Sequence, residues 1–328
     1  MGSCIVRELL ADYSVLPVQE LRVLDIKDLQ GITDDRLTFI NGDVRDQTTV
    51  NEACLGVDGV IHSAALVDWG ANRPEVVYDI NFNGTKNLID ACKGNGVRAL
   101  VSTSSVDAIY TGKPLRDIDE LEPYPKKYPN MYGQSKSEAE QLVISNNTSS
   151  LSTCTIRPAD IWGEGDPYHL EALFNMAKSG FYVRLGDGKS KCQHVYVGNC
   201  AHAHVLALKA LLDGNENVEG QAYFITDGLA GNFFEFFDQI VLQSGQRVWP
   251  KNLWLPKWFA YGIGAISELI AWLVRPIKYY NPNFSRFAVN YTCTDLIFTS
   301  EKAKRDFGFE NKYEVEEAIE RTARYYSG

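Results

Sequence analysis

Two polar clusters in the sequence carry the residue types of an acid–base site. Residues 102–105 read Ser-Thr-Ser-Ser after an apolar run, and a second run, Tyr-Gly-Gln-Ser-Lys, extends from Tyr132 to Lys136. Residues four apart share a face of a helix, so the Lys136 ammonium would lie beside the Tyr132 phenol and lower its pKa. The Ser105 hydroxyl would hold a substrate oxygen against that phenol. The predicted chemistry is proton transfer to or from an alcohol or carbonyl.

Apolar runs and helical periodicity predict the framework that must position these residues. The segments that read as strands are 21–25, 37–40, 59–62 and 98–101, and helical patterns occupy residues 3–10 and 76–93. Strands that alternate with helices imply right-handed crossovers and a parallel, doubly wound sheet. We therefore expect an α/β fold with two parts. A Rossmann-like domain would span residues 1–160 plus about 195–228, and a smaller substrate domain would span about 161–194 and 229–328.

Further signals lie at the ends of the predicted strands, where sheets of this type bind ligands. Asp25 closes its strand where a carboxylate would hydrogen-bond a ribose 2′-hydroxyl and repel a 2′-phosphate, which favours NAD over NADP. Asp43 and Val44 follow the next strand, where an adenine edge would lie. Ala64 and Ala65 leave space for a nucleotide close to the backbone. Each residue alone fits an ordinary surface, turn or packing role, but together they predict a dinucleotide site.

The start of the sequence departs from the usual dinucleotide fingerprint. That fingerprint places a glycine-rich turn after a first strand and an acid about 20 residues later. Gly2 matches the last glycine of the turn, because Asp25 follows it at about the expected distance. The first strand and the two earlier glycines have no counterpart in the sequence. We therefore expect a sheet without its first strand, and we interpret Met1 as an internal residue of a longer parent.

Several stretches together resemble the extended short-chain dehydrogenase/reductase family, specifically its 3β-hydroxysteroid dehydrogenase branch. They are residues 42–46 (Gly-Asp-Val-Arg-Asp), 60–65 (Val-Ile-His-Ser-Ala-Ala), 81–85 (Asn-Phe-Asn-Gly-Thr), 104–106, 132–136, 157–166, 194–199 and 223–228. The resemblance covers essentially the whole chain from Gly2. One departure is Gly198, which stands where the family often has Asp before Asn199.

The resemblance implies NAD as the cofactor and a role for each of five residues. Tyr132 would be the general acid/base, and Lys136 would lower its pKa. Both would contact the cofactor, Lys136 at the nicotinamide ribose. Ser105 would orient the substrate oxygen. Asn81 would contact the cofactor, and Pro158 would abut the nicotinamide. The resemblance also suggests a homodimer.

The composition argues against several other functions. A formal net charge of -10 argues against a nucleic-acid partner. The seven cysteines form no C-x-x-C pair, which indicates reduced thiols and a cytoplasmic location. We predict no metal site, because His202 and His204 are two residues apart and poorly spaced for a shared helical site. We expect His62, on a buried strand, to be a hydrogen-bonded core residue.

The segment from Trp258 to Val274 carries one charged residue, Glu268. Three interpretations compete: a buried helix that lines the substrate pocket, a helix that lies against a membrane, and a true span, for which the segment is short. Apolar substrates such as sterols partition into bilayers, so the first two can both hold. The second interpretation would add peripheral association with the endoplasmic reticulum membrane.

We expect an NAD-dependent oxidoreductase that acts on a secondary alcohol of a small apolar steroid or sterol, with a 3β-hydroxyl as the leading candidate. The nearest alternatives are enzymes of sterol 4α-carboxylates or flavanonol-like compounds. A sugar-nucleotide epimerase fits less well, because residues 258–274 suit an apolar substrate. A further alternative is a catalytically inactive form with a binding role, motivated by the absent strand and glycines.

Overall fold

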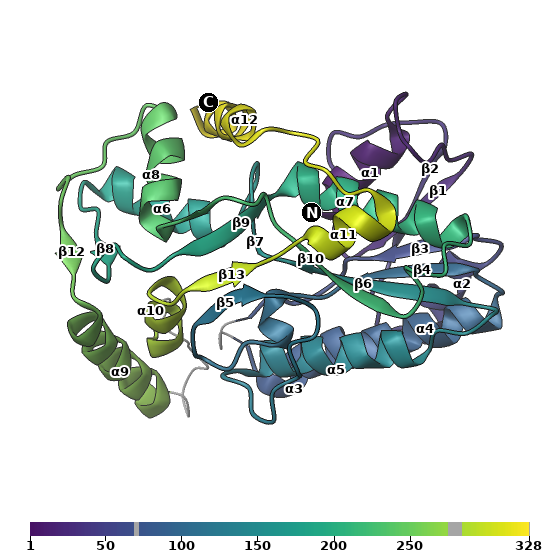
Figure 1. Cartoon of the computed structure of the whole chain (residues 1–328), viewed down its shortest axis with the longest axis horizontal. Helices are drawn as coiled ribbons and strands as arrows, with labels where there is room; N and C mark the ends of the chain where they lie inside the picture. Colours follow the sequence, from purple (N-terminus) through teal and green to yellow (C-terminus); the bar gives the residue numbers. More distant parts are fainter. Residues whose placement is uncertain (69–71, 275–283, 328) are drawn as a thin grey trace.

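The computed structural model describes residues 1–68, 72–274 and 284–327. A parallel four-stranded sheet lies at its centre, in the order β10 (Gln221–Ile225), β6 (Ser152–Pro158), β4 (Ala99–Thr103) and β3 (Gly59–His62). A second parallel pair, β1 (Leu21–Asp25) and β2 (Leu37–Asn41), lies near β3 (Figure 1). Within the described residues no strand is hydrogen-bonded between β1 and β3, which agrees with the expected sheet that lacks its first strand.

Helices cover both faces of the central sheet. One face carries α1 (Gly2–Leu10), α7 (Val197–Leu212) and α11 (Glu301–Phe307), and the other carries α2 (Gln47–Cys54), α4 (Gly84–Gly94) and α5 (Met131–Ser145) (Figure 1). Successive side chains of β4 point to opposite faces. Val101 accordingly packs among α7 residues, whereas Leu100 packs among residues of α2 and α4. This doubly wound α/β arrangement confirms the predicted fold class.

The helix predicted at residues 76–93 is interrupted. It consists of α3 (Pro74–Tyr78), a π-helical turn (Asp79–Asn83) and α4. A π turn inserts one extra residue into a helix and is frequent at functional sites. Here it presents Asn81, which is buried, toward Ser135 of α5.

The rest of the chain builds a five-stranded sheet, a separate two-stranded sheet in which β12 pairs with β8, and a further core. The additional strands are β5 (Leu115–Ile118), β7 (Asp160–Trp162), β8 (Arg184–Leu185), β9 (Cys192–Tyr196), β11 (Ala230–Gly231), β12 (Trp254–Leu255) and β13 (Leu296–Phe298). The additional helices are α6 (His169–Ser179), α8 (Phe233–Gln243), α9 (Lys257–Val274), α10 (Arg286–Thr292) and α12 (Val315–Ser327). The aromatic run of α8 lies mostly in this core, because Phe233, Phe234 and Phe237 are buried there.

Helix α9 corrects one sequence prediction. Its buried residues are the small Ala260, Gly264 and Ala271, and its large side chains are exposed. The interpretation of this segment as a buried helix lining a pocket is therefore wrong, because its apolar face points away from the protein. In the described part of the chain, no helix has both the length and the hydropathy that a membrane crossing requires.

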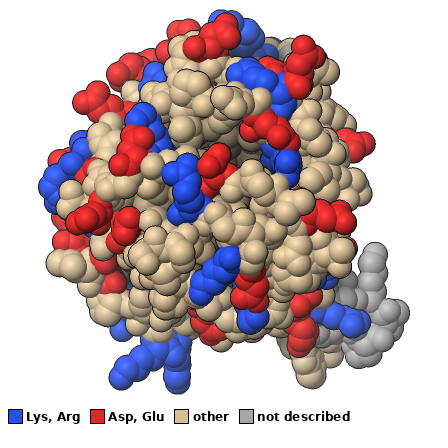
Figure 2. All heavy atoms as spheres, turned by 90° about the vertical axis from the view of Figure 1, so that its right-hand side faces the viewer, with Lys and Arg blue, Asp and Glu red and all other residues tan. Residues whose placement is uncertain are grey.

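The histidines singled out in the sequence have structural partners. His62 is buried and contacts Thr85 Oγ1 through Nε2 at 3.0 Å, as expected of a core histidine. His202 pairs with Glu8 at 2.8 Å, and His204 is buried. On the face shown in Figure 2, Lys and Arg side chains alternate with Asp and Glu, so that face carries no continuous basic surface.

Candidate active site

Tyr132 and Lys136 lie on the first turns of α5. The helix begins at Met131, because Asn130 caps it with a hydrogen bond from Gly133 N–H to its Oδ1 at 2.8 Å. Tyr132 is 6% exposed and Lys136 is 4% exposed. The predicted i, i+4 pair is therefore on one helix and out of bulk water.

The carboxyl end of β4 anchors the Lys136 side chain. Its Nζ donates a hydrogen bond of 2.6 Å to the carbonyl of Thr103, the last residue of that strand. Burial lowers the pKa of Lys136 to about 8, because the charged ammonium is costly in a medium of low dielectric constant. The ammonium is therefore held in place without an ionised partner in direct contact among the described residues.

Ser105 meets the same helix from the loop after β4. It is buried and caps a short 3₁₀ turn (Val106–Ala108), with its Oγ accepting from Asp107 N–H at 3.1 Å. A Cβ at Gly133 would lie 2.9 Å from Asp107 O, so only glycine lets α5 approach this turn so closely. The Tyr132 hydroxyl interacts with the Ser105 side chain across this contact. The structure therefore brings the three predicted catalytic residues together.

The pKa of Tyr132 differs from the sequence prediction. It is raised above its usual value, first because burial favours the neutral phenol and second because the Asp107 carboxylate repels a phenolate. The expectation that Lys136 lowers this pKa does not hold in this structure, since its ammonium is directed to Thr103 O. The phenol form of Tyr132 is thereby favoured, which suits proton donation to a substrate oxygen.

Asn81 links the loop after β3 to the catalytic helix. Its Oδ1 accepts from Leu66 N–H at 2.7 Å, and its Nδ2 donates to Leu66 O at 3.1 Å and to Ser135 Oγ at 3.0 Å. Ser135 lies between Tyr132 and Lys136 on α5. Asn81 therefore braces the predicted cofactor loop against the catalytic helix, and its direct contact with a cofactor stays a prediction.

Two acids predicted to bind the adenosine part of a dinucleotide lie where β1 and β2 end. Asp25 is the exposed last residue of β1, and its Oδ1 accepts from Lys27 N–H at 2.9 Å. Asp43 follows β2 and pairs with Arg45, whose Nη2 lies 2.6 Å from Asp43 Oδ2 and holds the pKa of that carboxyl below its usual value. Val44 packs so tightly against Gly84 that a Cβ there would lie 2.6 Å from Val44 Cγ2.

Small residues border the route between these acids and Tyr132. Gly2 begins α1, which has no side-chain N-cap, and a Cβ at Gly2 would lie 3.6 Å from Ser63 Oγ. Ala64 and Ala65 follow β3 directly, and Pro158 ends β6. An uncapped helix start beside small residues suits a pyrophosphate. The residues present therefore fit a dinucleotide that runs from Asp25 toward Tyr132.

The sequence analysis missed a buried ionisable cluster behind Ser105. Asp107 Oδ2 lies 3.1 Å from Ser105 Oγ, and burial together with the like charge of Asp160 raises the pKa of Asp107 to about 7. Two histidines lie beside Asp160: His194 Nδ1 is 3.8 Å and His169 Nε2 is 4.0 Å from Asp160 Oδ2. The signal in the sequence was an acid within an apolar stretch two residues after Ser105. No group of His, Cys, Asp and Glu in the described ranges is arranged to hold a metal ion.

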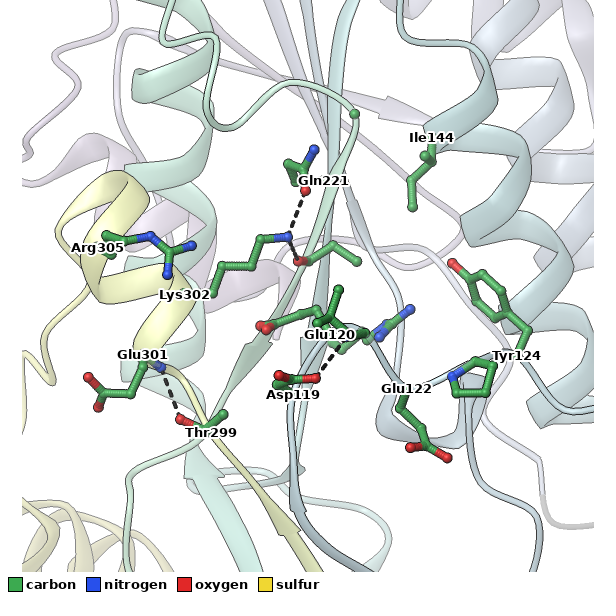
Figure 3. Close-up of a pocket in the computed structure, with 15 residues that line it drawn as sticks. Asp119, Glu120, Glu122, Tyr124, Ile144, Gln221, Thr299, Glu301, Lys302 and Arg305 are labelled. Atoms are coloured by element: carbon green, nitrogen blue, oxygen red, sulfur yellow. Dashed lines mark hydrogen bonds between the residues drawn. The ribbon is translucent and has the colours of Figure 1, made fainter.

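A pocket of about 660 Å³ lies away from these residues, at the outer edge of β10 (Figure 3). Lys302 donates to Gln221 Oε1 at 2.7 Å and to Ala222 O at 3.1 Å on its wall. Glu120 accepts from Phe224 N–H at 2.8 Å. These side chains form hydrogen bonds with backbone and side-chain groups of β10, which is an edge strand. The pocket therefore lies where side chains cover the edge of the sheet and prevent a further strand from pairing with it.

Solved structures with similar architecture define the fold class. The dTDP-glucose 4,6-dehydratase DesIV double mutant from Streptomyces venezuelae, with NAD bound, matches with a TM-score of 0.75 at 21% identity, over 99% of this chain and 93% of that one. The UDP-glucose 4-epimerase of Thermus thermophilus, in complex with NAD, matches with a TM-score of 0.72 at 20% identity, over 100% and 96%. The chain therefore has the Rossmann-like α/β fold that these enzymes share.

Sequence comparisons define the family. The profile of the 3-beta hydroxysteroid dehydrogenase/isomerase family matches residues 1–255. The 3beta-hydroxysteroid-dehydrogenase/decarboxylase isoform 1 of Arabidopsis thaliana is 33% identical over 304 residues, which are 91% of this chain and 69% of that protein. The short-chain dehydrogenase/reductase family 42E member 1 of Danio rerio is 32% identical over 87% of this chain and 76% of that protein. This chain belongs to the 3-beta hydroxysteroid dehydrogenase/isomerase family, as the resemblance predicted.

Proposed function

We propose that this chain is an NAD-dependent oxidoreductase that oxidises the 3β-hydroxyl of a steroid or sterol. The observation that carries the proposal is the convergence of Ser105, Tyr132 and Lys136 at the carboxyl end of β4, in a chain of this family. NAD is the cofactor that the family indicates, and NAD-bound structures with this fold agree. When bound, NAD supplies the acceptor for the hydride that leaves the carbinol carbon.

The chain's own residues would handle the proton and the substrate oxygen. Ser105 would hold that oxygen by a hydrogen bond. Tyr132 would take the hydroxyl proton as the phenolate during oxidation and would return it as the phenol during reduction, the direction that the raised pKa favours. Lys136, fixed on Thr103 O, would hold positive charge beside the phenol and the nicotinamide ribose. The alcohol thus loses one proton and one hydride and becomes a ketone. Burial of all three side chains keeps bulk water from the transfer.

A 4α-carboxylated sterol is a second candidate substrate. The Arabidopsis relative is named a dehydrogenase/decarboxylase, and simple chemistry connects the two activities. Oxidation of a 3-hydroxyl beside a C4 carboxylate yields a β-keto acid. Such an acid loses CO₂ when its C4–carboxylate bond breaks and the electron pair moves into the enolate, which is then protonated. The same Ser105 and Tyr132 would serve the oxidation step.

Substrate selectivity tests the proposal. The purified chain would be incubated with NAD and, separately, a 3β-hydroxysteroid, its 3α epimer, a 4α-carboxylated 3β-hydroxysterol and UDP-glucose, while NADH absorbance and CO₂ are measured. We expect NADH from the 3β-hydroxyl compounds and little from the 3α epimer. Turnover of UDP-glucose without turnover of any steroid would contradict the substrate class. NAD binding with no turnover at all would support the inactive alternative.

Helix α9 supports the further proposal that the protein contacts a membrane surface. Its exposed large side chains are Trp258, Phe259, Tyr261, Ile263, Ile266, Leu269, Ile270, Trp272, Leu273 and Val274. At 100° per residue they spread over about two thirds of the helix circumference. The packed side is narrow, since a Cβ at Gly264 would lie 2.8 Å from the backbone of Arg286 in α10. An apolar surface of this kind marks an interaction site.

A lipid bilayer fits this helix better than a second copy of the chain. A rigid protein would cover one side of the helix, whereas lipid can surround the exposed arc on three sides. Glu268 lies on the packed side and pairs with Arg286 at 2.6 Å, so no unpaired charge enters the apolar arc. Trp258 and Trp272 lie near the two ends of the helix, 77% and 64% exposed, and Trp favours the membrane–water interface.

Vesicle binding tests this surface. We expect the chain to co-sediment with phosphatidylcholine vesicles. An Ile266→Glu, Leu269→Glu variant should bind at least about tenfold more weakly, because each buried side chain contributes about 1.5–3 kcal/mol. Leu55→Glu, an exposed apolar position outside α9, is the matched control and should bind as the unmodified chain does. Absence of vesicle binding, with a dimer that the α9 variant dissociates in light scattering, would assign the face to a second copy.

A further inference from the structure

The Ser105 hydroxyl is engaged twice by one neighbour, Asp107. Its Oγ accepts from Asp107 N–H at 3.1 Å and lies 3.1 Å from Asp107 Oδ2. Both residues are 7% exposed, so water does not compete for these contacts. The proposed mechanism uses Ser105 but assigns no task to the carboxyl group of Asp107.

The number of hydrogen bonds that a serine can make limits what Ser105 can do. A hydroxyl has one proton and two lone pairs, and one lone pair is already taken by Asp107 N–H. An ionised carboxylate only accepts, so ionised Asp107 draws the Ser105 proton to itself. A protonated carboxyl instead donates to Ser105 and leaves the Ser105 proton available to another acceptor.

We propose that Asp107 is a positioning residue whose protonation decides whether Ser105 donates a hydrogen bond to the substrate oxygen. This inference rests on the proposed function, because it assumes that Ser105 holds that oxygen. It assigns Asp107 no contact with substrate or cofactor. Its effect passes through the Ser105 hydroxyl, and its charge additionally acts on the Tyr132 phenol.

Titratable groups face Asp107 from each element packed around it. They are Asp160 of β7, His169 of α6, Tyr132 of α5, Tyr291 of α10, and Tyr110 in the segment after the 3₁₀ turn. Burial and the like charge of Asp160 raise the pKa of Asp107 to about 7, against the opposing effects of Ser105 and His169. The tyrosines keep their protons at neutral pH, because burial raises the pKa of each. The carboxyl group of Asp107 therefore changes charge near neutral pH while these phenols do not.

The direction of the pH effect follows from the donor count. Below its pKa, protonated Asp107 donates to Ser105, and Ser105 and Tyr132 both donate to the oxygen of a ketone. Above its pKa, ionised Asp107 takes the Ser105 proton, and Tyr132 remains the only donor of the pair. Reduction of a 3-ketosteroid, in which the carbonyl carbon gains a hydride from NADH and the oxygen gains a proton from Tyr132, should therefore slow as the pH rises.

The test is the pH dependence of kcat/KM for reduction of a 3-ketosteroid by NADH. Between pH 6 and pH 8 we expect a fall of about tenfold or more in the unmodified chain, because a carboxyl with a pKa near 7 loses most of its protons over this range. The amide of Asp107→Asn does not titrate, so the fall should shrink to about threefold or less. The residual fall reflects Lys136, whose pKa is about 8, and His169, whose pKa Asp166 and Asp160 raise despite burial, because the substitution removes neither group.

A second variant and a second measurement test the same inference without relying on Asp107→Asn kinetics. Asp160→Asn retains an acceptor for the Tyr291 hydroxyl but removes the like charge, so the midpoint should move to lower pH. Infrared difference spectra should show a protonated carboxyl that disappears near pH 7 in the unmodified chain and is absent from Asp107→Asn.

Each failure has a distinct signature. If the pH profile of Asp107→Asn is unchanged and this variant retains the infrared signal of a protonated carboxyl, the inference is overturned. The proposed function would still stand. If the chain reduces no ketosteroid at any pH, the proposed function is overturned and this inference with it. The infrared titration would then report only the protonation of Asp107.

Discussion

Replacing Tyr132 with Phe should abolish turnover while leaving the protein folded. General acid–base catalysis contributes about 10²–10⁴-fold to rate, and Tyr132 is the phenol placed beside Ser105 and Lys136. We expect kcat for 3β-hydroxysteroid oxidation to fall by about that factor. The aromatic ring remains, so packing around the buried side chain is preserved. The measurement is NADH absorbance at saturating NAD, with the melting temperature recorded for both proteins.

Tyr223 provides the matched control, because it is also a buried tyrosine. Its hydroxyl donates to Asn217 O at 3.1 Å and lies 3.1 Å from Asp306, away from Ser105. Tyr223→Phe should cost about 1 kcal/mol of unfolding free energy and leave kcat within about twofold. A Tyr132→Phe variant as active as Tyr223→Phe would refute the role assigned to the phenol.

Replacing Glu140 with Gln should strongly destabilise the protein. Glu140 lies one turn beyond Lys136 on α5, and its Oε1 is 2.6 Å from Arg157 Nη2 of β6. The side chains of this pair are 0% and 2% exposed, respectively. Removing the carboxylate leaves a buried guanidinium without its counter-charge, so we expect a loss of about 3 kcal/mol or more in unfolding free energy, measured by urea denaturation. Because the pair fastens α5 to the sheet, kcat should fall as well.

Glu138→Gln on the same helix is the comparison for that loss. Glu138 is partly exposed and accepts from Tyr78 at 2.7 Å through Oε2 and from Gln134 at 2.8 Å through Oε1. The oxygen of the new amide can still accept from Tyr78, and its NH₂ group can donate to Gln134 once the Gln134 amide turns over. Its substitution should cost about 1 kcal/mol or less. Equal stability of the two variants would mean that the buried pair does not fasten α5 to β6.

Local sequence patterns predicted the strands and the shared helix of Tyr132 and Lys136 well, because each depends on residues that are close together in the sequence. Asp25 ends its strand and Ser105 follows β4 as expected, since apolar runs bounded by polar residues mark buried parallel strands. The cap of α5 was not predicted, because Asn130, a preferred N-cap residue, was not recognised as one.

Other features depend on contacts between distant residues and left weak signals. Asn81 lies in a π turn and hydrogen-bonds to Leu66 and Ser135. The hydrophobic periodicity of the sequence did not predict this turn. The pKa of Asp107, in the 3₁₀ turn after β4, depends on Asp160, which lies in β7 and is distant in the sequence. The apolar pattern of α9 is the same for a buried helix and an exposed one, so only the packing shows that its large side chains face outward.

The proposed function requires this chain to move a hydride from a 3β-carbinol carbon to NAD. A 3β-hydroxysteroid with deuterium on that carbon, incubated with NAD and the purified chain, tests it in one measurement by mass spectrometry. We expect NADH that carries the deuterium and a ketosteroid that has lost it, with neither product detected for Tyr132→Phe. Unlabelled cofactor and intact steroid, recovered from a folded chain that binds NAD, would contradict it.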